Sequence, residues 1–349
     1  MGVLVCPPGA ARRWPDSGGE AGPIVVGLVN NMPDAALHAT ERQFLDLLSA
    51  ASGVRTVRLR LLHVPEVPRG DAGRAHVGQH YETVAQLGDG DQLDGLIVTG
   101  TEPRARRLED EPYWPALARL ADRVEDRAVP TVWSCLAAQV AVLRADGIVR
   151  RPFDRKLSGV FDCVRAAEHP ITAGFPPRWR VPQTRRNDLP EAELAASGYQ
   201  VLSRLPDAGA DVFAREGRSL QLFVQGHPEY DPRALCREYK RDIERYLTGA
   251  QDAYPDPMRG YFEAPVASAL EAFRARALRT RAPALMLELP AALAGWEPAH
   301  DWREPAVRLY ANWLTHVSAR KDRGDALARR RPAAGRPHAL GATPLREPA

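Results

Sequence analysis

Short apolar runs alternate with amphipathic segments along the first half of the chain. Residues 24–29 and 95–98 are apolar throughout, which is typical of strands that are buried on both faces. In residues 34–50 the apolar side chains recur at helical spacing. The pattern predicts an α/β fold with a mainly parallel sheet flanked by helices. Its elements are strands at 23–29, 54–64, 95–99 and 129–133, and helices at 34–50, 112–124 and 136–145.

The second half of the chain is richer in predicted strands. They cover 157–164, 199–205, 211–215 and 220–225, and helices follow at 232–247 and 304–318. The Pro- and Ala-rich residues 251–303 read as an appendage that contains one helix at 267–279. We therefore expect one domain over residues 23–319, with a loose leader at 1–22 and a disordered basic tail at 320–349.

The charge distribution argues against nucleic acid as a partner. The 349 residues carry a formal net charge of +3. Residues 319–349 contain eight basic and three acidic residues, so the rest of the chain carries −2. A slightly acidic body is not a polyanion-binding surface, and the basic run 329–331 is read as part of a solvated tail. Of the 47 basic residues only Lys156, Lys240 and Lys321 are lysines.

Composition also bears on location and metal content. The four cysteines form no CxxC pair and no metal-binding cluster, which favours a reducing compartment. No apolar run approaches the roughly 20 residues that span a bilayer, and the N-terminus lacks the core of a signal peptide. The sequence predicts a cytoplasmic protein with no metal and no membrane contact.

Cys135 is placed where a buried strand is predicted to end and a helix to begin. The free N–H groups and the positive dipole end of a helix N-terminus favour a thiolate. The same N–H groups can donate to an oxyanion in acyl transfer. A buried cysteine that packs as a small hydrophobe is the alternative. The placement alone leaves both interpretations open.

A second candidate group, His227 and Glu229, follows the strand predicted at 220–225. A histidine at the carboxyl edge of such a sheet lies where open α/β folds bind ligands. Glu229 can hold the tautomer of the imidazole and leave its other nitrogen facing a thiol. Taken together with Cys135, the pair predicts a Cys-His-Glu triad. An exposed turn with incidental charges is the alternative.

The ordered motifs make the chain similar to a known family. Over residues 24–318 it resembles the homoserine O-succinyltransferase/O-acetyltransferase family, whose fold is class I glutamine amidotransferase-like (flavodoxin-like). The motifs are NMP at 31–33, TERQFL at 40–45, DGLIVTG at 94–100, YWP at 113–115, SC at 134–135, KLSGV at 156–160, GHPEYD at 226–231, RD at 241–242 and NWL at 312–314.

The resemblance implies an activity and roles for individual residues. Cys135 would form the acyl-thioester, His227 would act as general base and Glu229 would orient it. Lys156, Thr184 and Arg241 would contact substrate, and cationic side chains suit the carboxylate of homoserine. For Arg241, which lies in an arginine-rich helix, a surface ion pair is the alternative. The reaction would be ping-pong transfer from succinyl-CoA or acetyl-CoA to L-homoserine for methionine biosynthesis. The acyl-CoA is a co-substrate, no cofactor is bound, and a homodimer is expected.

Departures from the family pattern bear on specificity. Gln183-Thr184-Arg185 stands where the family has His-Ser-Arg, and Arg104 stands at the position that governs acyl choice. An arginine there could pair with the free carboxylate of a succinyl group, which favours succinyl-CoA over acetyl-CoA. A side chain that points to solvent is the alternative. The residues 251–303 form a longer insertion than the family pattern predicts.

Three alternatives to this activity remain open. The first is a glutaminase of the amidotransferase type, although residues 133–137 (WSCLA) lack the glycines that usually surround its cysteine. The second is a serine O-acyltransferase, and the third is a non-catalytic module that keeps the fold.

Overall fold

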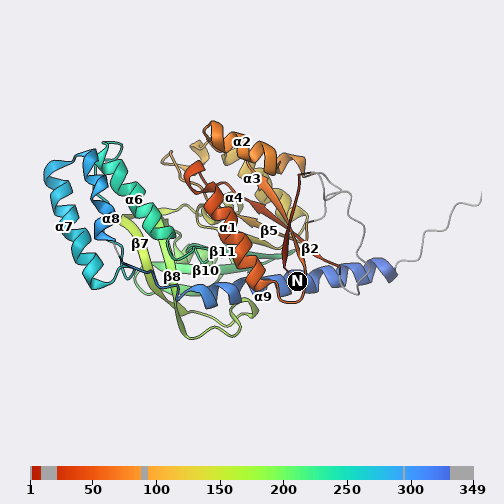
Figure 1. Cartoon of the computed structure of the whole chain (residues 1–349). Helices are drawn as coiled ribbons and strands as arrows, with labels where there is room; N and C mark the ends of the chain where they lie inside the picture. The colour runs from red at the N-terminus through yellow and green to blue at the C-terminus, as the bar shows by residue number, and fades with distance from the viewer. Residues whose placement is uncertain (1, 9–21, 88–92, 294, 331–349) are drawn as a thin grey trace, which may run out of the picture.

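One large sheet organises the molecule (Figure 1). The computed structural model describes residues 2–8, 22–87, 93–293 and 295–330. The sheet continues from its parallel half into an antiparallel half, which confirms the predicted α/β class. The parallel strands are, in spatial order, β1 (Val3–Cys6), β3 (Val57–His63), β2 (Ile24–Val29), β5 (Gly95–Val98), β6 (Thr131–Ser134) and β11 (Leu220–Val224). The antiparallel strands are β10 (Gly209–Glu216), β9 (Gln200–Leu205), β7 (Arg151–Arg165) and β8 (Arg178–Asp188), and β4 (Glu82–Thr83) pairs with β3.

Helices cover both faces of the parallel half. Ile97 of β5 belongs to a core that includes residues of α1 and α9. Its neighbours Leu96 and Val98 belong to the opposite core, under α3 and α4. Burial on both faces explains the continuous apolar strands. The helices are α1 (Asp34–Ala51), α2 (Asp71–His80), α3 (Trp114–Asp126), α4 (Leu136–Asp146), α5 (Glu191–Ala196), α6 (Ala234–Leu247), α7 (Ala264–Thr280), α8 (Leu289–Ala292) and α9 (Arg303–Arg330). No described helix is both long and apolar enough to cross a membrane.

The region 251–303 is packed onto the domain. Apolar residues of α7, among them Leu270 and Phe273, share a third core with Ile243 and Tyr239 of α6. In Figure 1, α6, α7 and α8 lie together at the end of the molecule where β7 and β8 also lie. The segment predicted as an appendage therefore packs against α6, a helix that lines the candidate site.

The two predicted ends differ from the structure. The loose leader is wrong for Val3–Cys6, which pair in parallel with β3 and extend the sheet edge. The tail prediction is wrong for 320–330, which continue α9. Ion pairs hold this extension, because Lys321 Nζ lies 2.8 Å from Asp94 and Asp322 lies 3.0 Å from Arg55. Residues 9–21 and 331–349 lie outside the described residues.

Candidate active site

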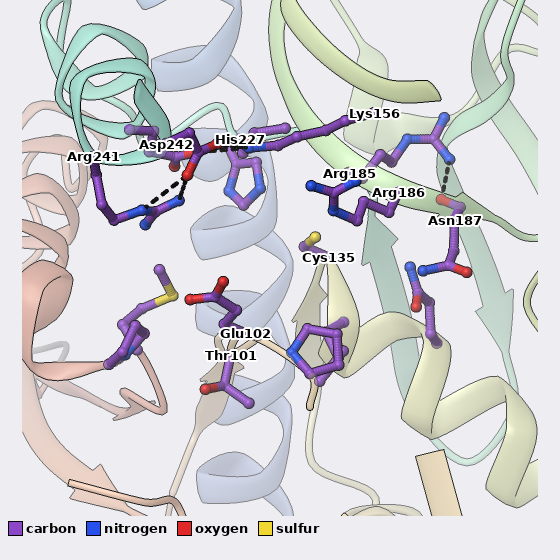
Figure 2. Close-up of a pocket in the computed structure, with 18 of the residues that line it drawn as sticks. Thr101, Glu102, Cys135, Lys156, Arg185, Arg186, Asn187, His227, Arg241 and Asp242 are labelled. Carbon is purple, nitrogen blue, oxygen red and sulfur yellow. Dashed lines mark hydrogen bonds and ion pairs between the residues drawn. The ribbon is translucent and has the colours of Figure 1, made fainter. Parts of the chain in front are cut away.

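The carboxyl ends of four parallel strands meet at an open cavity. The loops after β2, β5, β6 and β11 bring Met32, Gly100, Cys135 and His227 to its wall. Residues of β7, β8 and α6 form the rest of the wall (Figure 2). This edge of an open α/β sheet is where such folds bind ligands.

Cys135 joins β6 to α4 in a sharp turn. Its φ of 51° and ψ of −113° are uncommon for a residue with a side chain. The turn is held by the Cys135 N–H, which donates to the carbonyl of Val224 at 2.7 Å. Gly100 passes so close that an added Cβ would lie 2.9 Å from the Leu136 nitrogen. Gly100 and Leu136 both line the cavity, and the missing side chain of Gly100 leaves space beside the Leu136 N–H, which can stabilise an oxyanion.

His227 and Glu229 form a buried pair beside the thiol. Nδ1 of His227 lies 2.9 Å from Oε1 of Glu229, and the backbone N–H of His227 donates to Pro182 on β8 at 2.9 Å. Burial opposes the charged imidazole, but Glu229 and Cys135 outweigh it, so the pKa of His227 is raised well above its ordinary value. The geometry suits a base that takes and returns the proton of Cys135.

A carboxylate that the sequence did not single out, Glu238 of α6, lies next to this pair. The Thr184 hydroxyl donates to Glu238 Oε2 at 2.6 Å, and the Tyr230 hydroxyl donates to Oε1. Tyr230 also stacks on His227 with ring centroids 4.4 Å apart. Burial, together with Glu238, raises the pKa of the Tyr230 hydroxyl, so it stays protonated and keeps donating. Thr184 and Tyr230 thereby aim the carboxylate.

The predicted substrate cations Lys156 and Arg241 meet at Asp242. Lys156 Nζ lies 2.9 Å from Asp242 Oδ2 and 3.8 Å from Glu238, and Arg241 Nη2 lies 3.0 Å from Asp242 Oδ1. Burial alone would raise the pKa of Asp242, but Lys156 and Arg241 lower it below its ordinary value. This wall of the cavity therefore holds two cations and two anions in one cluster. Figure 2 shows three of them, Lys156, Arg241 and Asp242.

Arg104 lies apart from the other predicted site residues. Its side chain is exposed and is not among the residues that line the cavity. The loop that carries it is pinned because the backbone N–H groups of Arg104 and Ala105 donate to Glu111 at 2.5 and 2.6 Å. Of the other six predicted residues, five line the cavity and Glu229 pairs with one of them, His227. Arg150 and Arg186, which were not predicted, also line the cavity.

A buried carboxylate ties β8 to the loop of His227. Asp211 Oδ1 accepts from Gln183 Nε2 at 2.7 Å and from the Gly226 N–H at 3.1 Å. The Cys163 thiol donates to Oδ2 at 3.7 Å. Full burial raises the pKa of Asp211 in spite of these donors. Gln183, one of the departures from the family pattern, therefore helps to hold the loop of His227 in place through Asp211.

Gly159, in the predicted KLSGV motif, is required by a close backbone contact. It has a φ of +132°, and an added Cβ would lie 2.1 Å from the carbonyl oxygen of Arg259. The Val160 N–H donates to that carbonyl at 2.8 Å, and the Arg259 N–H donates to Ser158 at 3.0 Å. The bridge fixes region 251–303 to β7 three residues beyond Lys156.

We expect Gly159→Ala to destabilise the protein by about 3 kcal/mol or more, because strain and a backbone clash combine. Gly147→Ala is the matched control. It also replaces a glycine at positive φ (+70°), but nothing lies within 4 Å of its added Cβ, so a loss of about 1 kcal/mol is expected. Urea denaturation measures both, and equal losses would argue against the close-contact explanation.

Some residues of the cavity were not predicted from the sequence, although their spacing along α6 and β8 contains a signal. Glu238 precedes Arg241 by three positions and Arg245 follows it by four, so helical spacing places all three on one face. Arg186 shares a face of β8 with Thr184, because strands alternate with period two. The predictions did not include strand 178–188 at all, because its run of arginines hides the apolar alternation.

A group of potential metal ligands lies outside the cavity. The ligand atoms of His38, Glu41 and His76, on α1 and α2, all lie within 4.8 Å of one another. Glu41 already accepts from the Tyr81 hydroxyl at 3.1 Å and contacts His76 at 3.0 Å. None of the three lines the cavity, so they lie outside the candidate active site.

Comparisons with known proteins point to one family. A family model described as homoserine O-succinyltransferase matches residues 17–323. A homoserine O-succinyltransferase from Rhodopseudomonas palustris is 46% identical over 307 residues, 88% of this chain and 92% of that protein. One from Methylorubrum extorquens is 47% identical over 295 residues, 84% of this chain and 87% of that protein. A solved glutamine amidotransferase from Methylobacillus flagellatus shares the fold, with a TM-score of 0.51 at 15% identity, covering 84% of this chain and 94% of the other.

Proposed function

This chain belongs to the homoserine O-succinyltransferase family, and from this premise we propose that it transfers the succinyl group of succinyl-CoA to the hydroxyl of L-homoserine. The family match confirms the resemblance that the motifs predicted. The observation that carries the proposal is the buried His227–Glu229 pair beside Cys135, at a cavity that also holds a balanced cluster of charges.

The first half-reaction loads the enzyme. His227 takes the proton of Cys135, and the thiolate attacks the carbonyl carbon of the succinyl thioester. The amides at the start of α4, next to Gly100, stabilise the oxyanion that forms. When the tetrahedral intermediate collapses, the bond to the CoA sulfur breaks and His227 returns the proton to it. CoA leaves as the thiol, and the succinyl group remains on Cys135.

The second half-reaction uses the same base. His227 takes the proton of the homoserine hydroxyl, whose oxygen attacks the acyl carbon on Cys135. Collapse breaks the bond to the Cys135 sulfur, and the proton on His227 returns to that sulfur. The product is O-succinyl-L-homoserine, and the enzyme is restored. Transfer through a covalent intermediate predicts ping-pong kinetics.

The cluster on α6 and β7 suits the amino acid acceptor. Homoserine is a zwitterion, so its site needs both signs of charge. Lys156 and Arg241 offer cations to its carboxylate, while Glu238 and Asp242 offer anions to its ammonium group. Substrate binding exchanges ion pairs within the protein for ion pairs with the ligand, so neither partner leaves a charge uncompensated. Thr184 contributes indirectly, because its hydroxyl donates to Glu238 and holds that carboxylate in position.

We expect Lys156→Met to raise the KM for homoserine by about 10- to 100-fold, because one charge-assisted contact is lost. Formation of the acyl-enzyme from succinyl-CoA should stay within about threefold, since the first half-reaction does not use this group. Lys321→Met is the matched control. It removes the pair of Lys321 on α9 with Asp94, whose 2.8 Å length is close to the 2.9 Å of Lys156–Asp242, away from the cavity. Equal effects on both half-reactions would contradict an acceptor role.

The donor and the acceptor can be identified in one experiment. The enzyme is incubated with succinyl-CoA or acetyl-CoA, its intact mass is recorded, and the acyl-enzyme is then chased with homoserine or serine. We expect a succinyl adduct that homoserine removes fastest. Release of ammonia from glutamine without an acyl adduct would instead support the glutaminase alternative. The homodimer and the cytoplasmic location stay predictions.

A further inference from the structure

The cations at the cavity differ in what they already bind. On the α6 side, each has a carboxylate partner: Lys156 and Arg241 pair with Asp242, and Arg245 donates to Glu102 at 2.6 and 2.9 Å. The Glu102–Arg245 hydrogen bond lowers the pKa of Glu102, so this pair is ionised. The α6 side is therefore close to electrically balanced, which suits a zwitterion but gives no surplus charge for a second carboxylate.

On the β8 side, Arg185 is buried and fully engaged. Its guanidinium donates to Asp188 at 2.7 Å, to Gln225 at 3.1 Å and to the carbonyl of Ala208 at 2.9 Å. Its function is to hold the loops around it. It is not a free receptor for substrate.

Arg150 is also committed. It donates to Gln139 at 3.4 Å and to the carbonyls of Ala105 and Arg106 at 3.4 and 3.2 Å. These contacts fix the loop that follows β5. Burial lowers the pKa of Arg150 from its ordinary value.

Arg186 lacks such commitments. It lines the cavity, its side chain is exposed, and within the described part of the chain it makes no hydrogen bond, ion pair or aromatic contact. Strand alternation places it on the same face as Thr184. In Figure 2 its side chain points toward the space beside Cys135, opposite Arg241 and Asp242. Arg186 is therefore a solvated cation that lines the same cavity as Cys135 and has no ion-pair partner among the described residues.

The chemistry of the donor calls for a cation at that place. Three carbon–carbon bonds of about 1.5 Å separate the thioester carbonyl of a succinyl group from its carboxylate carbon, which keeps the two carbons within about 4 Å. The receptor must therefore reach close to Cys135. A guanidinium can bind a carboxylate through two parallel N–H donors.

We propose that Arg186 is the specificity-determining residue that binds the distal carboxylate of the succinyl group. The inference rests on the proposed function, since it needs a dicarboxylic acyl donor. It also moves acyl recognition from Arg104, which is outside the cavity, to β8. The cavity then has an acceptor half on α6 and β7, where charges balance, and a donor half in which the guanidinium of Arg186 is available to bind a carboxylate.

The test compares donors that differ only in the carboxylate. Succinyl-CoA and butyryl-CoA have acyl chains of equal carbon number, and release of CoA in a single turnover reports acylation of Cys135 by each. For Arg186→Gln we expect acylation by succinyl-CoA to fall about 10- to 100-fold. Acylation by butyryl-CoA should change less than about threefold, and Arg186→Lys should retain part of the preference. An equal loss with both donors would overturn the proposal.

Arg104→Gln is the matched control, because it removes an exposed arginine from the loop beside the cavity. It should leave the ratio of the two donors unchanged. A ratio that falls in Arg104→Gln and not in Arg186→Gln would return acyl recognition to the loop. Wild-type enzyme that is acylated by acetyl-CoA and not by succinyl-CoA would overturn the proposed donor itself, and that result is visible before any variant is made. Thermal unfolding should be the same for both variants and the wild type.

Discussion

Replacing Cys135 with alanine is expected to lower kcat/KM by at least about 10⁴-fold, because the atom that carries the acyl group is removed. The wild-type enzyme should gain the mass of one succinyl group when incubated with succinyl-CoA, and the variant should gain none. The fold should persist, since alanine keeps the Cβ and the backbone contacts of the turn.

The other cysteines provide the control for this result. Burial raises the pKa of Cys163 and of Cys236 above the ordinary thiol value, so neither offers a thiolate at neutral pH. Cys236→Ala should keep both the acyl adduct and the turnover. An adduct that survives in Cys135→Ala, or turnover near the wild-type rate, would place the nucleophile elsewhere.

The Glu229→Gln variant is expected to reduce kcat/KM by about 10³- to 10⁴-fold with little change of shape. The amide of glutamine can donate to Nδ1 of His227, which leaves the proton on Nε2, the nitrogen that must accept it from Cys135. Loss of the carboxylate also removes a negative charge that raises the pKa of His227, whereas burial lowers it. Steady-state kinetics at several pH values measures both effects.

A second His–Glu pair in the same chain gives a matched control. His169 lies 3.5 Å from Glu216, whose side chain is 71% exposed. Glu216→Gln should change the rate by less than about twofold, because an exposed pair is screened by water. If the two substitutions lowered activity equally, the loss in Glu229→Gln would not be due to the orientation of His227.

The same pair makes a pH-dependent contribution to stability. The pKa of His227 is raised on folding. The pair's contribution is therefore fully present below the unfolded pKa of about 6.5 and is lost as the pH rises through the higher folded pKa. The difference in unfolding free energy between the wild type and Glu229→Gln should be largest near pH 6 and should shrink at alkaline pH.

Strands buried on both faces were predictable from the sequence, because periodicity reports burial directly. The runs at 24–29 and 95–98 became β2 and β5 with nearly the predicted bounds. β8 was missed because Arg185 lies at one of its buried positions, where it finds partners that a pattern of apolar residues cannot show. The strand in the leader and the extension of α9 depend on contacts between segments that are far apart in the sequence.

The site residues that could be predicted from the sequence are those whose place in the fold follows from their position next to a strand. The placement of Cys135 between a strand and a helix, and of His227 after another strand, follows from the parallel topology. The carboxylate partners of Lys156 and Arg241 did not follow from it, because they depend on which face α6 turns to β7. The position of Arg104 was predicted by resemblance alone, and the loop that Glu111 pins carries its side chain elsewhere.

The backbone of Cys135 carries a cost that the chemistry imposes. A φ of 51° with ψ of −113° is a conformation that glycine adopts more readily than any residue with a Cβ. A chain selected for stability alone would place glycine there. The nucleophile can occupy this turn only because the surrounding sheet and α4 supply enough stability to hold it. The enzyme thus has a lower free energy of unfolding than it would have with glycine at this position, because the reaction requires a cysteine there.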